Sequence, residues 1–233
     1  LDEINPNNFA NKEKNIFKIK SFSSNKEIEK QLNNENIYLS KGYWILNDLK
    51  LIDKKIFLED GSIVILQGEN SFVGKNKVFE FSGPGMISQV NGKINLSNVS
   101  FSKIKNIKIN GLNWTGSVNL INSNVSINDT KIVDNYGEDA INIVGSVSSI
   151  NNLIVENSFR DSVDIDFGKV KFSKIICKTS GNDCLDTSGA LVSGDYLDFL
   201  EELVIEDANG FYYNLKPDIS SRNNGLSFGI FLT

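Results

Sequence analysis

A 22-residue repeat constrains the fold of this chain more than any other feature of its sequence. The segment Glu138–Ile143 recurs as Arg160–Ile165 and again as Asn182–Thr187, so an aspartate leads at positions 139, 161 and 183. A fixed period of this length is typical of a solenoid, in which each repeat is one coil that buries its apolar side chains by stacking on its neighbours. The register extends to about residue 199. One coil earlier the spacing is 23, which predicts a one-residue insertion in the turn Asn135–Gly137.

Each repeat alternates apolar and polar residues with a period of two. Val163 and Ile165 flank Asp164, and Ile141 and Ile143 flank Asn142 in the same way. This alternation, with β-branched residues at the apolar positions, is typical of strands. Two short strands in 22 residues leave no room for a helix. We therefore expect an all-β chain folded as a single-stranded parallel β-helix, and a right-handed one because parallel crossovers nearly always are.

The chain divides into three parts. Residues 1–40 lack the repeat, and Ser24–Glu27 has the spacing of a capping box, which predicts a short amphipathic helix that covers the first coil. Residues 41–199 form the predicted β-helix, and residues 200–233 form an irregular C-terminal coil. Because the chain begins with Leu1 rather than Met, we expect it to be part of a longer protein.

Composition excludes two classes of partner. The net charge is -5 and the pI is near 4.9, so no basic stripe is present to bind the phosphates of a nucleic acid. No apolar run approaches the length needed to cross a membrane. Cys177 falls in an inward column and Cys184 in a turn column. The two cysteines could be buried as free apolar residues or could form a disulfide, and the sequence leaves both alternatives open.

Outward aspartates are the strongest candidates for chemistry. With Val163 inward, Asp164 and Asp166 point outward, and the period aligns Asp186 with Asp164 at about 4.8 Å, the distance between neighbouring strands. Carboxylates this close repel, so either one pKa rises or a cation bridges them. A neutral and an ionised carboxyl suit glycoside hydrolysis, whereas clustered oxygen ligands suit calcium. The structural alternative is a hydrogen-bonded ladder, with the leading aspartates at 139, 161 and 183 capping turns.

The repeats resemble a known group of proteins. Glu138–Val144, Arg160–Gly168 and Asn182–Ala190 are similar to coils of bacterial right-handed parallel β-helix domains of the pectin-lyase-like superfamily. The likeness is greatest to β-helix domains that accompany spore-coat-protein-H-like kinase domains, and it covers residues 115–199 and the first coils from Lys41. The resemblance implies the fold rather than an activity, and it supplies no catalytic residues.

Enzyme activity finds little support in the residue types present. The chain has 0 His, so it lacks the histidine that polygalacturonase-like sites carry. The base of a polysaccharide lyase would have to be Arg160, Lys171 or Lys174. Because Arg160 adjoins Asp161, a surface ion pair explains it more simply.

We therefore expect a non-catalytic, extracellular or cell-surface module that is structural and binds a polysaccharide or cell-surface glycan. The predicted ligand-binding side chains are Asn142, Asp164, Asp166, Asp186, Trp114, Tyr136 and Phe159, because acidic residues and sugar-stacking aromatics would line such a site. The alternative is a polysaccharide lyase or hydrolase that uses Asp164, Asp166, Asp186 and Arg160. No cofactor is expected except calcium, for which Asp164, Asp166 and Asp186 are the candidate ligands. A third possibility is an architectural spacer.

Overall fold

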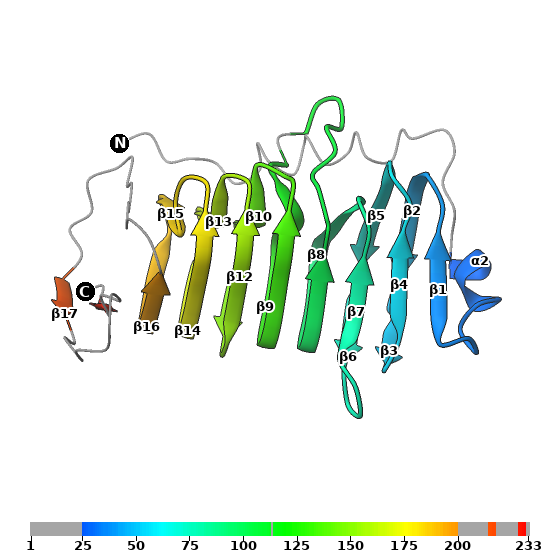
Figure 1. Ribbon diagram of the computed structural model, residues 1–233, viewed down its shortest axis with the longest axis horizontal. Coiled ribbons are helices and arrows are strands. Elements are labelled where there is room, and N and C mark those ends of the chain that lie inside the picture. The colour runs from blue at the N-terminus through cyan, green and yellow to red at the C-terminus, as the bar shows by residue number, and fades with distance from the viewer. Residues whose placement is uncertain (1–24, 113, 200–213, 218–227, 232–233) are drawn as a thin grey trace.

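The computed structural model describes residues 25–112, 114–199, 214–217 and 228–231, and it is a parallel β-solenoid of about seven coils. The strands of successive coils lie side by side along the long axis of the molecule (Figure 1). The predicted all-β repeat fold is therefore confirmed. Within the described residues, no helix is long and apolar enough to cross a membrane.

Each regular coil contains three strands, so the prediction of two was wrong. The third strand was missed because segments such as Val147–Ile150 carry serines and show no aliphatic alternation. We name the three sides of the solenoid by their strands. The first face contains β2 Gly42–Asn47, β5 Ser62–Gln67, β10 Asp139–Val144, β13 Asp161–Asp166 and β15 Leu185–Ser188. The second face contains β3 Lys50–Ile52, β6 Glu69–Val73, β11 Val147–Ile150 and the first halves of β14 Lys169–Ser180 and β16 Leu191–Phe199.

The third face contains β1 Asn36–Leu39, β4 Lys55–Leu58, β7 Phe79–Ser82, β12 Leu153–Ser158 and the second halves of β14 and β16. Two long strands, β8 Met86–Ser102 and β9 Gly116–Asn135, bend through all three faces. Since β1 pairs with β4, the first coil begins within the segment assigned to the cap.

The register of the coils matches the sequence repeat. Asp139 pairs with Asp161, and Asn142 pairs with Asp164 on one side and Asn119 on the other. The predicted insertion is also confirmed: residues 136–138 connect β9 to β10, whereas only residues 159–160 connect β12 to β13. The extra residue is accommodated in a turn because an insertion in a strand would reverse the orientation of every following side chain.

A single residue turns the chain from the first face to the second in every coil. The residues at this corner all have positive φ, and they are Asp48, Gly68, Asn91, Asn122, Gly145, Phe167 and Gly189. Glycine, asparagine and aspartate tolerate this left-handed conformation because their steric cost is low. Phe167 is the exception in this column, at φ 53°.

The interior is a continuous apolar core with an aromatic stack in its N-terminal half. The rings of Phe81 and Phe101 stack with centroids 4.9 Å apart, and Phe72 meets Phe81 edge-on at 5.1 Å. All three side chains are fully buried. Later coils continue the core with aliphatic residues such as Val163 and Ile165.

The two ends of the solenoid differ. The short helix α2, Asn25–Glu29, lies beside the first coil (Figure 1), with Ile28 buried and Leu32 packed against the core. This confirms the predicted capping helix, although Ser24 of the capping box lies outside the described residues. Towards the other end, Cys177 and Cys184 form a disulfide, and β18 Phe228–Phe231 pairs antiparallel with β16 and with β17 Asn214–Pro217.

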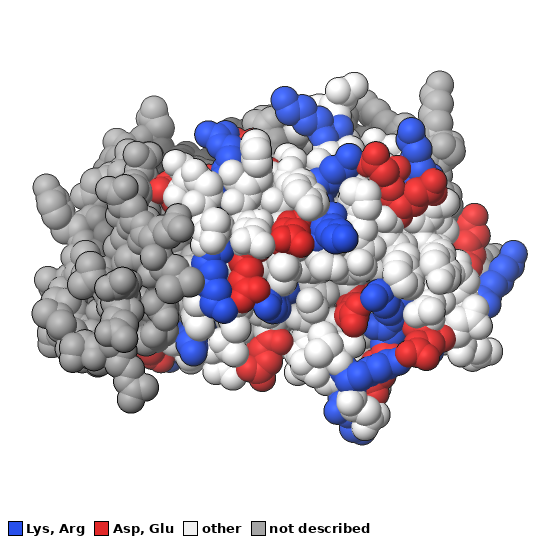
Figure 2. Space-filling view, viewed as in Figure 1, with Lys and Arg blue, Asp and Glu red and all other residues white. Residues whose placement is uncertain are grey.

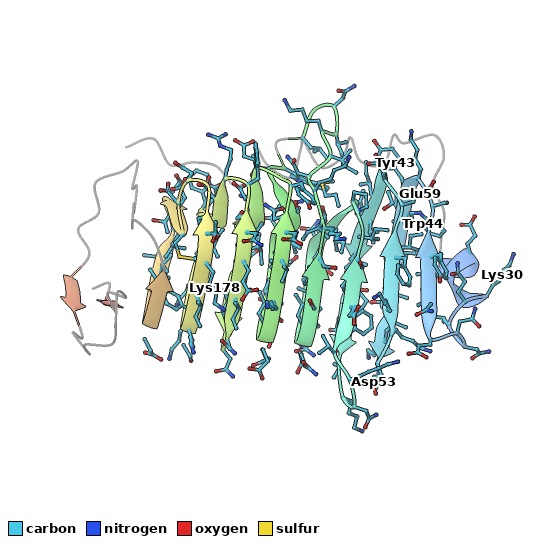
Figure 3. The ribbon with its side chains drawn as sticks, in the orientation of Figure 1. Lys30, Tyr43, Trp44, Asp53, Glu59 and Lys178 are labelled. Atoms are coloured by element: carbon cyan, nitrogen blue, oxygen red, sulfur yellow. A yellow bond between two sulfur atoms is a disulfide. The ribbon has the colours of Figure 1, made fainter. Side chains whose placement is uncertain are left out.

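The outer surface of the third face carries matched charges. Glu156 accepts from both Lys131 and Lys178 at 2.6 Å, so one carboxylate joins three coils. Lysines and acids lie close together over this face (Figure 2), and Lys178 projects from β14 (Figure 3). Charges of opposite sign at coil spacing therefore neutralise each other here.

Truncation in the aromatic stack should destabilise the whole solenoid. Phe81→Ala removes a buried ring that contacts three others, so we expect the free energy of unfolding to fall by about 3–5 kcal/mol. Urea denaturation followed by circular dichroism measures it. Tyr38→Ala, on an exposed ring of the third face, is the control and should cost far less. Equal losses in the two variants would contradict a continuous core.

Candidate functional site

The outward side chains of the first face form the two columns predicted from the sequence. Asn119, Asn142, Asp164 and Asp186 occupy one column in successive coils, and Ile121, Val144, Asp166 and Ser188 occupy the next. The alignment follows from parallel pairing, which places equivalent residues of adjacent coils beside each other. Four of the predicted ligand-binding residues are thus brought together.

The loop between β8 and β9, residues 103–115, covers the N-terminal half of this face. It leaves the coils (Figure 1) and packs Ile107, Ile109, Leu112 and Trp114 against outward residues that include Met86, Ile121 and Val144. Trp114 is half-buried in this contact. It therefore helps to hold the loop in place, and much of its ring is unavailable to a ligand. The polar columns lie at the edge of the covered area.

Asn142 connects the carboxyl groups of this face. Its Nδ2 donates to Asp164 Oδ2 at 2.5 Å, and it also bonds Asp166. The amide nitrogen of Asn142 is therefore the donor that Asp164 and Asp166 share.

Burial and mutual repulsion raise the pKa values of this cluster. The pKa of Asp164 rises to about 8, chiefly through burial and then through the charges of Asp166, Asp139 and Asp186. Burial also raises the pKa of Asp139 to about 7 and the pKa of Asp166 above its usual range. At neutral pH the cluster therefore holds protons.

Asp53 shows the opposite behaviour elsewhere in the same solenoid. Its carboxylate accepts backbone N–H groups of Lys75 and Asn76, and these bonds lower its pKa to about 2. It lies at a corner of the solenoid away from the first face (Figure 3). The two carboxyls thus differ in environment: Asp53 is surrounded by backbone donors, whereas Asp164 is buried beside like charges.

The aspartates that lead each repeat have two different roles. Asp161 Oδ1 accepts from the backbone N–H of Asp183 and from Asn182 Nδ2, both at 2.9 Å, as predicted for a turn-capping residue. Asp139 instead bonds Thr115 of the covering loop, and its charge acts on Asp164. The sequence did not assign Asp139 to the site because Thr115 comes from an irregular loop.

Exposed aromatic side chains precede β10 and lie at both ends of β13. Tyr136 and Phe159 occupy the preceding turns, 58% and 68% exposed, and Phe167 follows β13 at the corner, 41% exposed. Phe167 was not predicted as a site residue. Its signal was present in the alignment, because it replaces the glycines Gly145 and Gly189 of adjacent coils.

Arg160 does not contact the carboxyl cluster. Its guanidinium donates to Glu138 of the preceding coil at 2.8 Å, and both side chains are exposed. The surface ion pair predicted from the sequence is confirmed, but its partner is Glu138 rather than the adjoining Asp161. The guanidinium that the lyase alternative would use as a base is therefore already bound to Glu138.

Metal binding finds no geometric support. Searching the described part of the chain finds no group of three or more His, Cys, Asp or Glu side chains placed to hold a metal ion. Calcium at Asp164, Asp166 and Asp186 stays a prediction from the sequence.

The second face offers a contrasting surface. A depression of about 350 Å³ is lined by residues that include Val147, Lys169, Lys171 and Leu191. Two outward columns run along this face from β9 to β16. One contains Asn124, Val147, Lys169 and Leu191, the other contains Ser126, Ser149, Lys171 and Ser193, and neither contains an acidic residue. Two adjoining faces of one solenoid therefore differ in charge.

Comparison of the sequence with models of protein families, with curated proteins and with solved structures found no match. The likeness to the pectin-lyase-like superfamily thus stays a prediction from the repeats, beside the parallel solenoid that the structure shows.

Asp164→Asn should change the pH dependence of stability. Because the folded-state pKa of about 8 exceeds the ordinary value of 3.8, folding stability contributed by this group falls as pH rises from about 4 to about 8. The variant removes that loss. We expect its free energy of unfolding, relative to wild type, to rise by more than about 1 kcal/mol between pH 5 and 8, since one pKa unit corresponds to about 1.4 kcal/mol.

Urea denaturation across this pH range measures the difference, and Asp53→Asn is the matched control. The lowered pKa of Asp53 gives stability that is complete above pH 4, so the control should be weakened by a constant amount from pH 5 to 8. Parallel curves for wild type and Asp164→Asn would contradict a raised pKa.

Replacing Phe167 should stabilise the fold. Asparagine occupies the same corner at positions 91 and 122, so Phe167→Asn relieves the backbone strain of a bulky residue at positive φ. We expect a gain of about 1 kcal/mol in the free energy of unfolding, the low end of the cost of such strain. Phe159→Asn, at an exposed position without positive φ, serves as the control for loss of an aromatic ring. A loss of stability in Phe167→Asn alone would show that the ring itself stabilises the corner.

Proposed function

We propose that the protein is a non-catalytic carbohydrate-binding solenoid whose binding surface is the first face around β10 and β13. One observation carries the proposal: carboxyl and amide side chains with surplus hydrogen-bonding capacity lie between exposed aromatic rings. Phe159 precedes β13 and Phe167 follows it, with Asp164 and Asp166 outward between them. Sugars are bound by this combination because their C–H faces stack on rings while their hydroxyls bond to polar groups.

The protonation of the cluster suits a ligand rich in hydroxyls. A protonated carboxyl both donates and accepts, as a hydroxyl does, whereas an ionised carboxylate only accepts. The raised pKa values of Asp139 and Asp164 hold such protons at neutral pH. The cluster can therefore exchange hydrogen bonds with either oxygen or hydrogen of a sugar hydroxyl.

An extracellular or cell-surface location is part of the proposal. The disulfide between Cys177 and Cys184 supports it, since disulfides persist in oxidising surroundings. A solenoid of stacked coils also suits a structural role, because it presents an extended surface on a stiff body.

A polysaccharide hydrolase is the second candidate, and the raised pKa of Asp164 favours it. Glycoside hydrolysis needs a carboxylic acid that stays protonated and a second carboxylate nearby. Asp164 and Asp166 are two positions apart on one strand, which places their outward side chains about 7 Å apart at the base.

Titration calorimetry against a panel of neutral oligosaccharides tests binding. We expect the double variant Phe159→Ala/Phe167→Ala to raise Kd about tenfold, or about 1.4 kcal/mol. The control is Tyr38→Ala, which removes a ring 59% exposed on the third face. Binding unchanged in the double variant, or lost equally in the control, would contradict a site on the first face; no binding to any sugar would favour an architectural spacer.

Product analysis of the same mixtures separates the hydrolase from the binding module. Shortened oligosaccharides produced by wild type and not by Asp164→Asn would establish the enzyme. Intact sugars after prolonged incubation, with binding retained, agree with the non-catalytic proposal.

A further inference from the structure

The carboxyl cluster of the first face has more hydrogen-bond acceptors than donors. Asp139 Oδ2 and Asn142 Oδ1 are buried without a hydrogen-bond partner, in residues only 2% and 1% exposed. The ion pairs found in the described part of the chain involve none of Asp139, Asp164 and Asp166. A buried polar atom without a partner costs free energy, so a donor at this place would stabilise the site.

The identity of the missing donor can be narrowed by charge and geometry. Burial disfavours the ionised form of Asp139, Asp164 and Asp166 and so raises their pKa values. A bound cation would stabilise the ionised carboxylates and lower these pKa values. Calcium needs six to eight oxygen ligands at about 2.3–2.6 Å, and the described residues provide no such group of acids. An ammonium group needs only about three acceptors, at about 2.7–2.9 Å.

Half-exposed carboxyls give a ligand access to this cluster. Asp164 and Asp166 are partly exposed, whereas Asn142 and Asp139 lie deeper. An incoming ammonium would first meet the two partly exposed groups. Exposed rings at Phe159 and Phe167 lie at either end of the same strand, where a sugar ring that carries the amine can stack.

We propose that the first face selects a glycan with free amino groups, such as a polymer of 2-amino-2-deoxy sugars, whose ammonium binds between Asp164 and Asp166. This inference rests on the proposed function and adds the chemical class of the ligand. A neutral sugar would leave the surplus acceptors without a cation. An amino sugar supplies both the ring for stacking and the charged donor.

Proton release distinguishes this mode of binding from neutral recognition. The cluster holds protons at neutral pH, and an ammonium favours the ionised carboxylates, so binding must expel protons. Affinity should therefore increase as pH rises from about 5 towards about 6.5, where the carboxyls ionise more readily and the weakly basic amine of the sugar is still largely charged.

Calorimetric titration with a glucosamine tetramer and its fully N-acetylated counterpart tests the proposal. We expect the amine form to bind at least about tenfold more tightly at pH 6, where its amines are charged, and to release protons from the carboxyls, seen as a heat that varies with the ionisation enthalpy of the buffer. The double variant Asp164→Asn/Asp166→Asn keeps the shape and neutral form of these side chains, so it should fold and lose this preference. Asp195→Asn, an exposed acid of β16, is the control and should retain it.

Several results would overturn the inference. Equal binding of both tetramers, or a preference that persists in the double variant, would do so while leaving carbohydrate binding intact. Tetralysine binding as tightly as the glucosamine tetramer would show that the sugar ring contributes nothing. Failure of these tetramers and of every neutral oligosaccharide to bind would overturn the proposed function as well.

Discussion

Parallel hydrogen bonding between successive coils is the interaction on which the other features of this molecule depend. It places each side chain beside its equivalent 22 or 23 residues away, at about the 4.8 Å spacing of neighbouring strands. Apolar residues repeated at inward positions therefore form a continuous core. Outward residues repeated in the same way form columns, and whatever charge they carry is concentrated along them.

The same spacing has opposite electrostatic results on two faces. On the third face, Glu156 lies between Lys131 and Lys178, and the charges cancel. On the first face, Asp164 has Asp186 in the next coil and Asp166 on its own strand, and their repulsion adds to the effect of burial. The spacing of the coils does not explain this difference, because both faces have the same spacing. The residue types explain it, and they differ where a ligand site is proposed.

The sequence allowed prediction of the columns and the register that repeat, although the serine-bearing second strand of each coil was missed. Columns such as Asn142, Asp164 and Asp186 follow from a fixed period, and the turn insertion near Gly137 follows from a single change in that period. Features that depend on irregular segments were missed. Trp114 and Thr115 belong to a loop without periodicity, so neither the burial of the indole nor the bond from Thr115 to Asp139 could be anticipated.

Strand β13 departs twice from the rules that the rest of the solenoid obeys. Burial raises the pKa of its outward carboxyls beside the unpartnered oxygens of Asp139 and Asn142 on β10, and the residue that follows it, Phe167, has a backbone conformation that neighbouring coils assign to Gly145 and Gly189. Each departure costs stability, and a phenylalanine at positive φ is not required to build a coil, since the adjacent coils have glycine at this corner. Local violations of folding rules that occur together are expected at functional sites, where binding rather than folding determines the residue. The coincidence of an aromatic ring under backbone strain with unsatisfied carboxyl and amide oxygens therefore favours the first face over the charge-matched third face as the surface that contacts a ligand.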